Sequence, residues 1–296
     1  MAETKRVALV TGASSGIGAE TVKELLAAGY TVYAGARRVE RMQQLVTAGA
    51  KVLALDVTDD ASMVAAVDTI LEDTGRIDLL VNNAGYGSYG SLEDVPLDEG
   101  RRQFEVNIFG LARLTQLVLP TMRAVRAGRI INVGSIAGKV GEPFGAWYHA
   151  TKFAVEGLSD SLRMELRPFG IDVIIIEPGA ILTEWNGIAR DGLIKYSGAT
   201  AYRNGAHAHV NMLLSTESGS LPSPPSVVAK TILKSAMTKK PRTRYATGGG
   251  AKFVLFLHSV LSDRGFDGLL RLMSQQVQKK AASAPNRPIR SGGESK

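Results

Sequence analysis

The segment RVALVTGASSGIG, residues 6–18, decides the fold class of this chain. Its first half is a short apolar and β-branched run typical of a buried strand, and a helical pattern begins directly after its glycines. Glycines allow a tight turn and close approach of another molecule, and a helix N-terminus attracts phosphate through free N–H groups. The residues expected to bind a dinucleotide pyrophosphate are therefore Gly12, Ser14, Ser15, Gly16, Ile17 and Gly18.

Short apolar runs and helix-period segments alternate from this turn to Pro178. The pattern predicts strands at 6–12, 31–36, 51–56, 77–85, 129–135 and 171–179, with helices at 17–28, 40–47, 61–72, 97–122 and 148–166. Strands separated by helices imply a parallel sheet with helices on both faces, so we expect a doubly wound α/β fold.

The alternation is lost after Pro178. The prediction for the rest of the chain is loop with short helical pieces at 183–222, a linker at 220–226, a helix at 227–237, a short strand at 243–248, and one or two helices within 252–278 interrupted near 262–265. Residues 1–280 are expected to form one domain, with a substrate lid at about 183–225 and C-terminal helices at about 226–280. Residues 281–296 are small, polar and rich in Pro and Gly, which predicts a disordered tail.

Composition excludes several classes of protein. The chain has no cysteine, so disulfides and cysteine-ligated metals are absent. Its net charge of +7 is spread along the chain without an RNA-binding motif, so we expect no nucleic-acid partner. No stretch approaches the roughly 20 apolar residues of a membrane span, and the chain enters a strand almost at once. A cytoplasmic protein without a signal peptide is expected.

The residues after the second strand indicate the type of dinucleotide. A site that prefers NAD carries an acidic residue there to bind the ribose 2′-OH. This chain has Arg37 and Arg38 instead, and guanidinium groups pair well with a 2′-phosphate. NADP(H) is therefore predicted as the cofactor, although two solvated arginines would have the same sequence, above all at Arg38.

Other strand ends also carry residues suited to a cofactor, because the carboxyl ends of parallel strands share one crevice. Asp56 can accept a hydrogen bond from adenine, although it is equally suited to cap a helix or form a turn. Small residues after the fourth strand let a ligand lie against the backbone, and Thr183 can bond a carboxamide. The full expected set here is Asp56, Val57, Asn83, Ala84, Gly85, Pro178, Gly179 and Thr183.

Tyr148 and Lys152 are the candidate catalytic pair. They lie four residues apart on a predicted helix and so share a face. A free phenol has a pKa of about 10, and a nearby ammonium and an oxidised nicotinamide would lower it toward neutrality. Ser135 ends the fifth strand and can donate a hydrogen bond to a developing oxyanion. Asn107, in the preceding helix, could position a water that relays protons.

Together these motifs resemble the short-chain dehydrogenases/reductases over residues 6–183. The resemblance implies a Rossmann-type sheet of seven strands in the order 3-2-1-4-5-6-7, a catalytic tetrad of Asn107, Ser135, Tyr148 and Lys152, and use of NADP(H). It also implies a homodimer or homotetramer formed through the helices that begin at Leu97 and Tyr148. The long region after Thr183 is similar to the hydroxysteroid and retinol dehydrogenase branch and to bacterial ketone reductases.

In that family, the substrate pocket is formed by the loop after the fourth strand, the loop before the catalytic tyrosine and the segment after the sixth strand. Besides Ser135 and Tyr148, these supply Tyr86, Tyr89, Val140, Phe144, Trp147, Ile181, Trp185 and Met212. The apolar, aromatic character predicts a bulky steroid-, retinoid- or aryl-ketone-like carbonyl or alcohol. The sequence does not name the substrate, the direction or the oligomer size.

Other interpretations are less favoured. A non-catalytic NADP(H) sensor or scaffold would not need the complete tetrad, and a sugar-nucleotide epimerase or dehydratase would carry a polar substrate domain. His207 and His209 lack a third ligand, so no metal is expected, and His149 is assigned a structural role. The apolar run 253–257 could touch a membrane, but packing on the core or another subunit is favoured.

Overall fold

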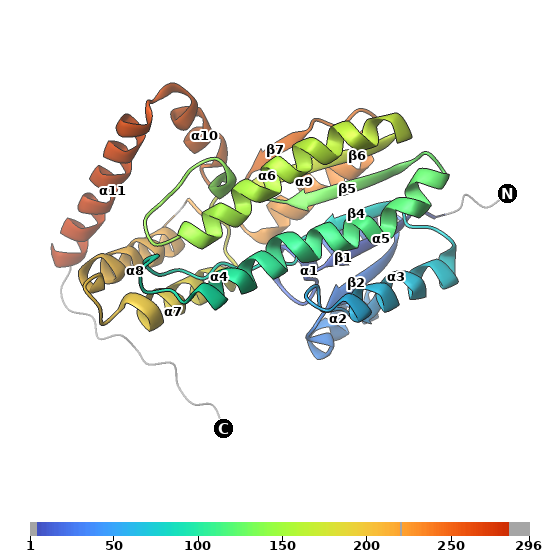
Figure 1. Cartoon of the computed structure of the whole chain (residues 1–296), viewed down its shortest axis with the longest axis horizontal. Helices are drawn as coiled ribbons and strands as arrows, with labels where there is room; N and C mark the ends of the chain where they lie inside the picture. The colour runs from blue at the N-terminus through green and yellow to red at the C-terminus, as the bar shows by residue number, and fades with distance from the viewer. Residues whose placement is uncertain (1–4, 220, 284–296) are drawn as a thin grey trace.

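The computed structural model describes residues 5–219 and 221–283. Its sheet contains seven parallel strands in the order β3-β2-β1-β4-β5-β6-β7, as the family resemblance predicted (Figure 1). The strands are β1 Val7–Thr11, β2 Thr31–Ala36, β3 Lys51–Ala54, β4 Leu79–Asn82, β5 Gly128–Val133, β6 Ile171–Pro178 and β7 Arg244–Thr247.

Helices cover both faces of the sheet. They are α1 Gly16–Ala27, α2 Gln43–Thr47, α3 Asp60–Thr74, α4 Leu97–Phe104, α5 Gly110–Ala124, α6 Ala146–Leu166, α7 Trp185–Ser197, α8 Arg203–Ser218, α9 Pro225–Met237, α10 Ala251–Val260 and α11 Asp263–Ser283. One apolar core joins the sheet to α1, α2 and α9, and a second joins it to α3 and α5. Neighbouring strand residues such as Leu9 and Val10 enter opposite cores, because strand side chains alternate between faces.

The predicted helix at 97–122 is interrupted in the structure. A π-helical segment, Glu105–Phe109, joins α4 to α5. Such single-turn π segments are frequent at functional sites. Here the segment contains Asn107, so the interruption sets the position of that side chain.

The prediction of loop with short helical pieces over 183–222 underestimated the helix content, because α7 and α8, of 13 and 16 residues, occupy most of it. The two helices contain glycine, asparagine, histidine and threonine, which have low helix propensity, so their sequences give little helical signal. They pack on each other, and α8 also packs on α11. Burial of Ala189, Leu193 and Ala206 against Tyr89 therefore supplies the stability that propensity lacks.

The C-terminal elements follow the prediction in part. The strand at 243–248 and the break in the last helices are confirmed by β7 and by the gap between α10 and α11. In the run 253–257, Val254, Leu255 and Leu257 are half-buried, whereas Phe253 and Phe256 are 64% and 60% exposed, so only one side of this run packs on the rest of the chain. Most of the predicted tail, 284–296, lies outside the described residues. None of the described helices has the length and apolar content needed to cross a bilayer.

Candidate active site

A cavity of about 610 Å³ opens at the carboxyl ends of the strands. It extends from the glycine turn after β1 to α7 and α8, which lie beyond this end of the sheet together with α10 and α11 (Figure 1). Of the residues predicted to bind cofactor, those lining the cavity are Gly12, Ser14, Ser15, Gly16, Ile17, Arg37, Arg38, Asp56, Val57, Asn83, Ala84, Gly85, Tyr148, Lys152, Pro178, Gly179 and Thr183.

The glycine turn after β1 has no room for side chains at two of its glycines. Gly12 adopts a φ of +65°, and a Cβ there would lie 2.9 Å from Ala84 Cα. Gly18 does not line the cavity; a Cβ on it would lie 2.3 Å from Gly12 O, so it packs α1 against the turn. The Ser15 side chain makes no capping hydrogen bond, and the first turn of α1 has no acidic residue. The backbone N–H groups at the start of α1 are therefore suited to bind an anionic group.

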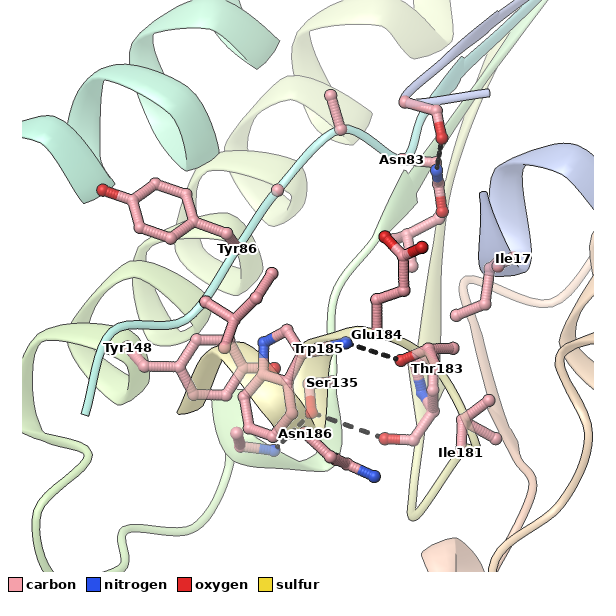
Figure 2. A pocket seen from close by; sticks show the side chains of 18 of the residues that line it. Ile17, Asn83, Tyr86, Ser135, Tyr148, Ile181, Thr183, Glu184, Trp185 and Asn186 are labelled. Carbon is pink, nitrogen blue, oxygen red and sulfur yellow. Dashed lines mark hydrogen bonds between the residues drawn. The ribbon is translucent and has the colours of Figure 1, made fainter. Parts of the chain in front are cut away.

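The amide of Asn83 fixes the position of this turn. Its Nδ2 donates to Thr11 O at 2.9 Å, and its backbone N donates to Thr11 Oγ1 at 3.0 Å (Figure 2). The end of β4 is thereby tied to the end of β1. Asn83 acts on the turn through these bonds as well as lining the cavity.

The two arginines after β2 lie in different surroundings. Arg38 Nη2 is 3.4 Å from Glu184 Oε2 and 3.4 Å from Ser14 Oγ, and Arg41 pairs with the same carboxylate at 2.9 Å. Arg37 is exposed at the cavity and forms no ion pair with any described residue. Asp56 Oδ1 accepts two hydrogen bonds from Thr58, so the turn-forming role is present there.

Ser135, Tyr148 and Lys152 line the same cavity as the glycine turn. Ser135 Oγ accepts from Ala137 N at 3.1 Å and donates to Pro178 O at 3.4 Å (Figure 2). Lys152 Nζ donates to Val133 O at 2.9 Å and lies 5.8 Å from the centre of the Tyr148 ring. The four-residue spacing on α6 thus directs both side chains to the cavity.

Burial shifts the pKa values of both Tyr148 and Lys152. Burial raises the pKa of Tyr148 to about 12, with Glu142 acting in the same direction and Ser135 in the opposite one. Burial lowers the pKa of Lys152 to about 8, against the attraction of Glu156. Lys152 was expected to lower the pKa of Tyr148 together with an oxidised nicotinamide. In the protein without a cofactor, the pKa of Tyr148 is raised instead.

Asn107 is 3% exposed and does not line the cavity. Its Nδ2 donates to Tyr86 O at 2.9 Å and to Thr151 Oγ1 at 3.0 Å, and its Oδ1 accepts from Tyr86 N at 3.1 Å. The side chain therefore joins the loop after β4 to α6. These bonds give it a positioning role.

Aromatic side chains surround Tyr148 on the substrate side. The ring centres of Trp185 and Tyr89 lie 5.0 Å and 5.9 Å from that of Tyr148, and Figure 2 shows Trp185 beside Tyr148 and Ser135. The predicted substrate residues that line the cavity are Tyr86, Tyr89, Ser135, Val140, Tyr148, Ile181, Trp185 and Met212.

Two predicted substrate residues need correction. Trp147 packs on α4, where a Cβ on Gly100 would lie 2.7 Å from its ring. Phe144 has a φ of +67°, and its ring packs against Tyr202 and His209. Neither lines the cavity. Sequence proximity to Tyr148 could not show which side each ring takes.

The cavity is also lined by residues that were not predicted from the sequence, Arg102, Glu142, Glu184 and Asn186, and by His149, for which only a structural role was predicted. A detectable signal existed for Glu142, because it is a single carboxylate in the otherwise apolar loop before Tyr148. His207 is exposed and His209 is 6% exposed between Tyr89 and Phe144. The described residues contain no group of three potential metal ligands.

Comparisons with known proteins agree with this geometry. Residues 6–193 match the family model described as short chain dehydrogenase. The chain is 36% identical over 269 residues, 90% of its length, to the probable short-chain type dehydrogenase/reductase VdlC of Helicobacter pylori, of which it covers 97%.

Two solved structures are similar over most of the chain. A short-chain dehydrogenase from Streptomyces avermitilis gives a TM-score of 0.75 at 35% identity, covering 96% of this chain and 100% of that one. The structure of a single-residue variant of actinorhodin polyketide ketoreductase with NADPH gives a TM-score of 0.72 at 29% identity. That match covers 85% of this chain and 99% of the ketoreductase chain. On this match of sequence, fold and cavity, the chain belongs to the short-chain dehydrogenase/reductase family, the oxidoreductases that act on CH–OH and C=O groups with a nicotinamide cofactor.

Proposed function

We propose that this protein is an NADP(H)-dependent reductase of bulky, mainly apolar ketones or aldehydes, with Tyr148 as the proton donor. The observation that carries the proposal is the convergence of Ser135, Tyr148 and Lys152 on the same cavity as the glycine turn. A hydride carrier and a proton donor can therefore meet one carbonyl group.

The proton chemistry follows from the surroundings of Tyr148. With its pKa raised to about 12, the phenol holds its proton at the hydroxyl oxygen at neutral pH. It can donate that proton as negative charge develops on a carbonyl oxygen, while the Ser135 hydroxyl donates a hydrogen bond to the same oxygen. Lys152, held by Val133 O, places positive charge 5.8 Å from the centre of the Tyr148 ring. When bound, the nicotinamide supplies the hydride.

Arg37 and Arg38 support NADP(H) as the cofactor. Arg37 is exposed at the cavity without a carboxylate partner among the described residues, and Arg38 is held by the weak, exposed contact with Glu184. Both guanidinium groups can receive a 2′-phosphate. The ketoreductase structure with NADPH is consistent with this choice.

The substrate side favours an apolar molecule with ring or chain surface. Trp185 and Tyr89 contribute flat faces near Tyr148, with Val140, Ile181 and Met212 in the same cavity. Such a wall stabilises apolar ligands by burying their surface.

The decisive experiment replaces Tyr148 with Phe and follows NADPH oxidation with a panel of steroid, retinoid, aryl and aliphatic carbonyl compounds. Loss of the proton donor should lower turnover by about a hundredfold or more, while NADPH affinity, measured by fluorescence, changes by less than about threefold. Tyr30→Phe, a buried tyrosine next to β2, is the matched control. A Tyr148→Phe protein that retains turnover would refute the assignment, and a wild-type protein that binds NADPH but reduces nothing would favour the sensor alternative.

A further inference from the structure

Glu142 places a carboxylate in the substrate side of the cavity. Its side chain is 30% exposed, and it lines the same space as Tyr148. Oε1 accepts a hydrogen bond of 2.5 Å from the hydroxyl of Tyr89, which is fully buried. Oε2 accepts no hydrogen bond from any described side chain or backbone N–H. Although burial favours the neutral acid, His149, His209 and Tyr89 hold its pKa below the usual value, so the group carries negative charge.

Two histidines border this carboxylate and leave polar atoms unpaired. His149 Nδ1 lies 3.0 Å from Ala137 O, and because a carbonyl can only accept, this nitrogen carries a proton. Nε2 lies 3.8 Å from Glu142 Oε1 and has no hydrogen-bond partner. Against the effect of burial, the Glu142 carboxylate raises the pKa of His149, so the protonated ring pairs with Glu142, and Nε2 is an acceptor in the neutral ring. His149 is 7% exposed. The Nε2 of His209, whose ring stacks on Tyr89, is also buried and unpaired.

The chain itself supplies no permanent cation to Glu142. Within residues 5–219 and 221–283, no lysine or arginine forms an ion pair with it. Lys152, the ammonium nearest the reacting centre, is bonded to Val133 O. Glu142 and His149 line the same cavity, and a ligand with several N–H donors and a positive charge can pair with the carboxylate and with the neutral ring in place of the ring proton.

We infer that Glu142 and His149 form a binding subsite for an ammonium group, so that the preferred substrate is an amino ketone whose apolar part lies against Trp185 and Tyr89. The inference rests on the proposed carbonyl reduction and names its substrate class. With the His149 ring neutral, an ammonium group donates to Glu142 and to His149 Nε2 at once, which a hydroxyl with one proton cannot do. Its charge also offsets the effect of Glu142 on Tyr148.

Matched ketones test this inference with the wild-type protein and NADPH. The probes are 2-amino-1-phenylethanone, its uncharged isostere 1-phenylpropan-1-one, and 2-hydroxy-1-phenylethanone. Wild type should prefer the amino ketone over the isostere by about tenfold or more in kcat/KM, the effect of a charge-assisted hydrogen bond. Glu142→Gln should abolish this preference, and Glu142→Asp, which keeps the charge, should retain part of it. Glu165→Gln, on the exposed face of α6, is the control.

Calorimetry separates failure of the inference from failure of the proposed activity. The NADPH complex is titrated with 2-amino-1-phenylethanol and with 1-phenylpropan-1-ol, which needs no turnover. Tighter binding of the amino alcohol that is lost in Glu142→Gln supports the subsite even if no ketone is reduced. Equal binding of the two alcohols, an unchanged ratio in Glu142→Gln, or equal preference for the hydroxy ketone would overturn the ammonium assignment.

Discussion

Glu177 gives a sharp test of how burial controls charge near the active site. It lies in β6 next to Pro178, is 4% exposed, and its Oε1 is 3.7 Å from Arg244 Nε. Arg244 makes its closer contacts with Glu156, at 2.9 Å, and Asp160, at 2.6 Å. Burial and the charge of Glu156 raise the pKa of Glu177 from 4.5 to about 7. The Oε1 of Glu156 is buried without a partner and can accept a hydrogen bond from the protonated Glu177 carboxyl.

The sign of the pH effect follows from this raised pKa. Between about pH 4.5 and pH 7 the folded protein binds the Glu177 proton more tightly than the unfolded chain, so the free energy of unfolding falls as pH rises. The pKa rises by about 2.5, and each pKa unit is worth about 1.4 kcal/mol, so the loss of stability is at most about 3.5 kcal/mol. Glu177→Gln, which resembles the protonated form, should not lose this stability.

Thermal unfolding from pH 5 to pH 8, followed by tryptophan fluorescence, measures the difference. Wild type and Glu177→Gln should have similar Tm at pH 5, and the variant should unfold roughly 5 °C higher at pH 8. Glu165→Gln, exposed on α6, should follow the wild-type curve. Parallel curves for wild type and Glu177→Gln over the whole range would refute the buried-acid argument.

Three further predictions concern the cofactor site and assembly. Arg37→Asp should weaken NADPH binding by about tenfold or more while changing NADH binding little, measured by fluorescence titration; an equal effect on both would reject the 2′-phosphate role. Gly12→Ala introduces a Cβ 2.9 Å from Ala84 Cα at a φ of +65°, so Tm and NADPH affinity should both fall, with a cost of about 1 kcal/mol or more; unchanged values would show that the turn adapts. The homodimer or homotetramer implied by the family resemblance is tested at Phe153, which is 48% exposed on α6: Phe153→Arg should give a smaller species than wild type in light scattering; a monomeric wild type would contradict this expectation.

Local sequence pattern predicted most of the sheet and the cofactor side of the site. The periods of strands and helices are properties of neighbouring residues, and the glycine turn could be placed because it lies between a strand and a helix. Parallel strands then bring Asn83, Ser135 and Gly179 to one edge whatever their separation in the chain. The strands, the helices and the glycine turn follow from patterns among neighbouring residues. The convergence of the strand ends follows from the rule that parallel strands end at one edge of the sheet.

The substrate side was predicted less well because it depends on packing between distant segments. The helices α7 and α8 are stabilised by contacts that no local pattern records, so they were expected as loop. The rings of Phe144 and Trp147 turn away from Tyr148 for the same reason: each finds a partner, His209 or Gly100, from another part of the chain. Glu142 was missed because its partners, Tyr89 and His149, come from two other elements.

The contact of Glu184 with Arg38 and Arg41 has a consequence for the rate at which the dinucleotide enters and leaves. These residues follow β6 and β2, and their ion pairs cross the mouth of the cavity while each side chain is more than 40% exposed. Exposed pairs are weak and are screened by salt. These ion pairs lie at the surface and outside both apolar cores, so we expect exchange of a nicotinamide cofactor to accelerate as ionic strength rises.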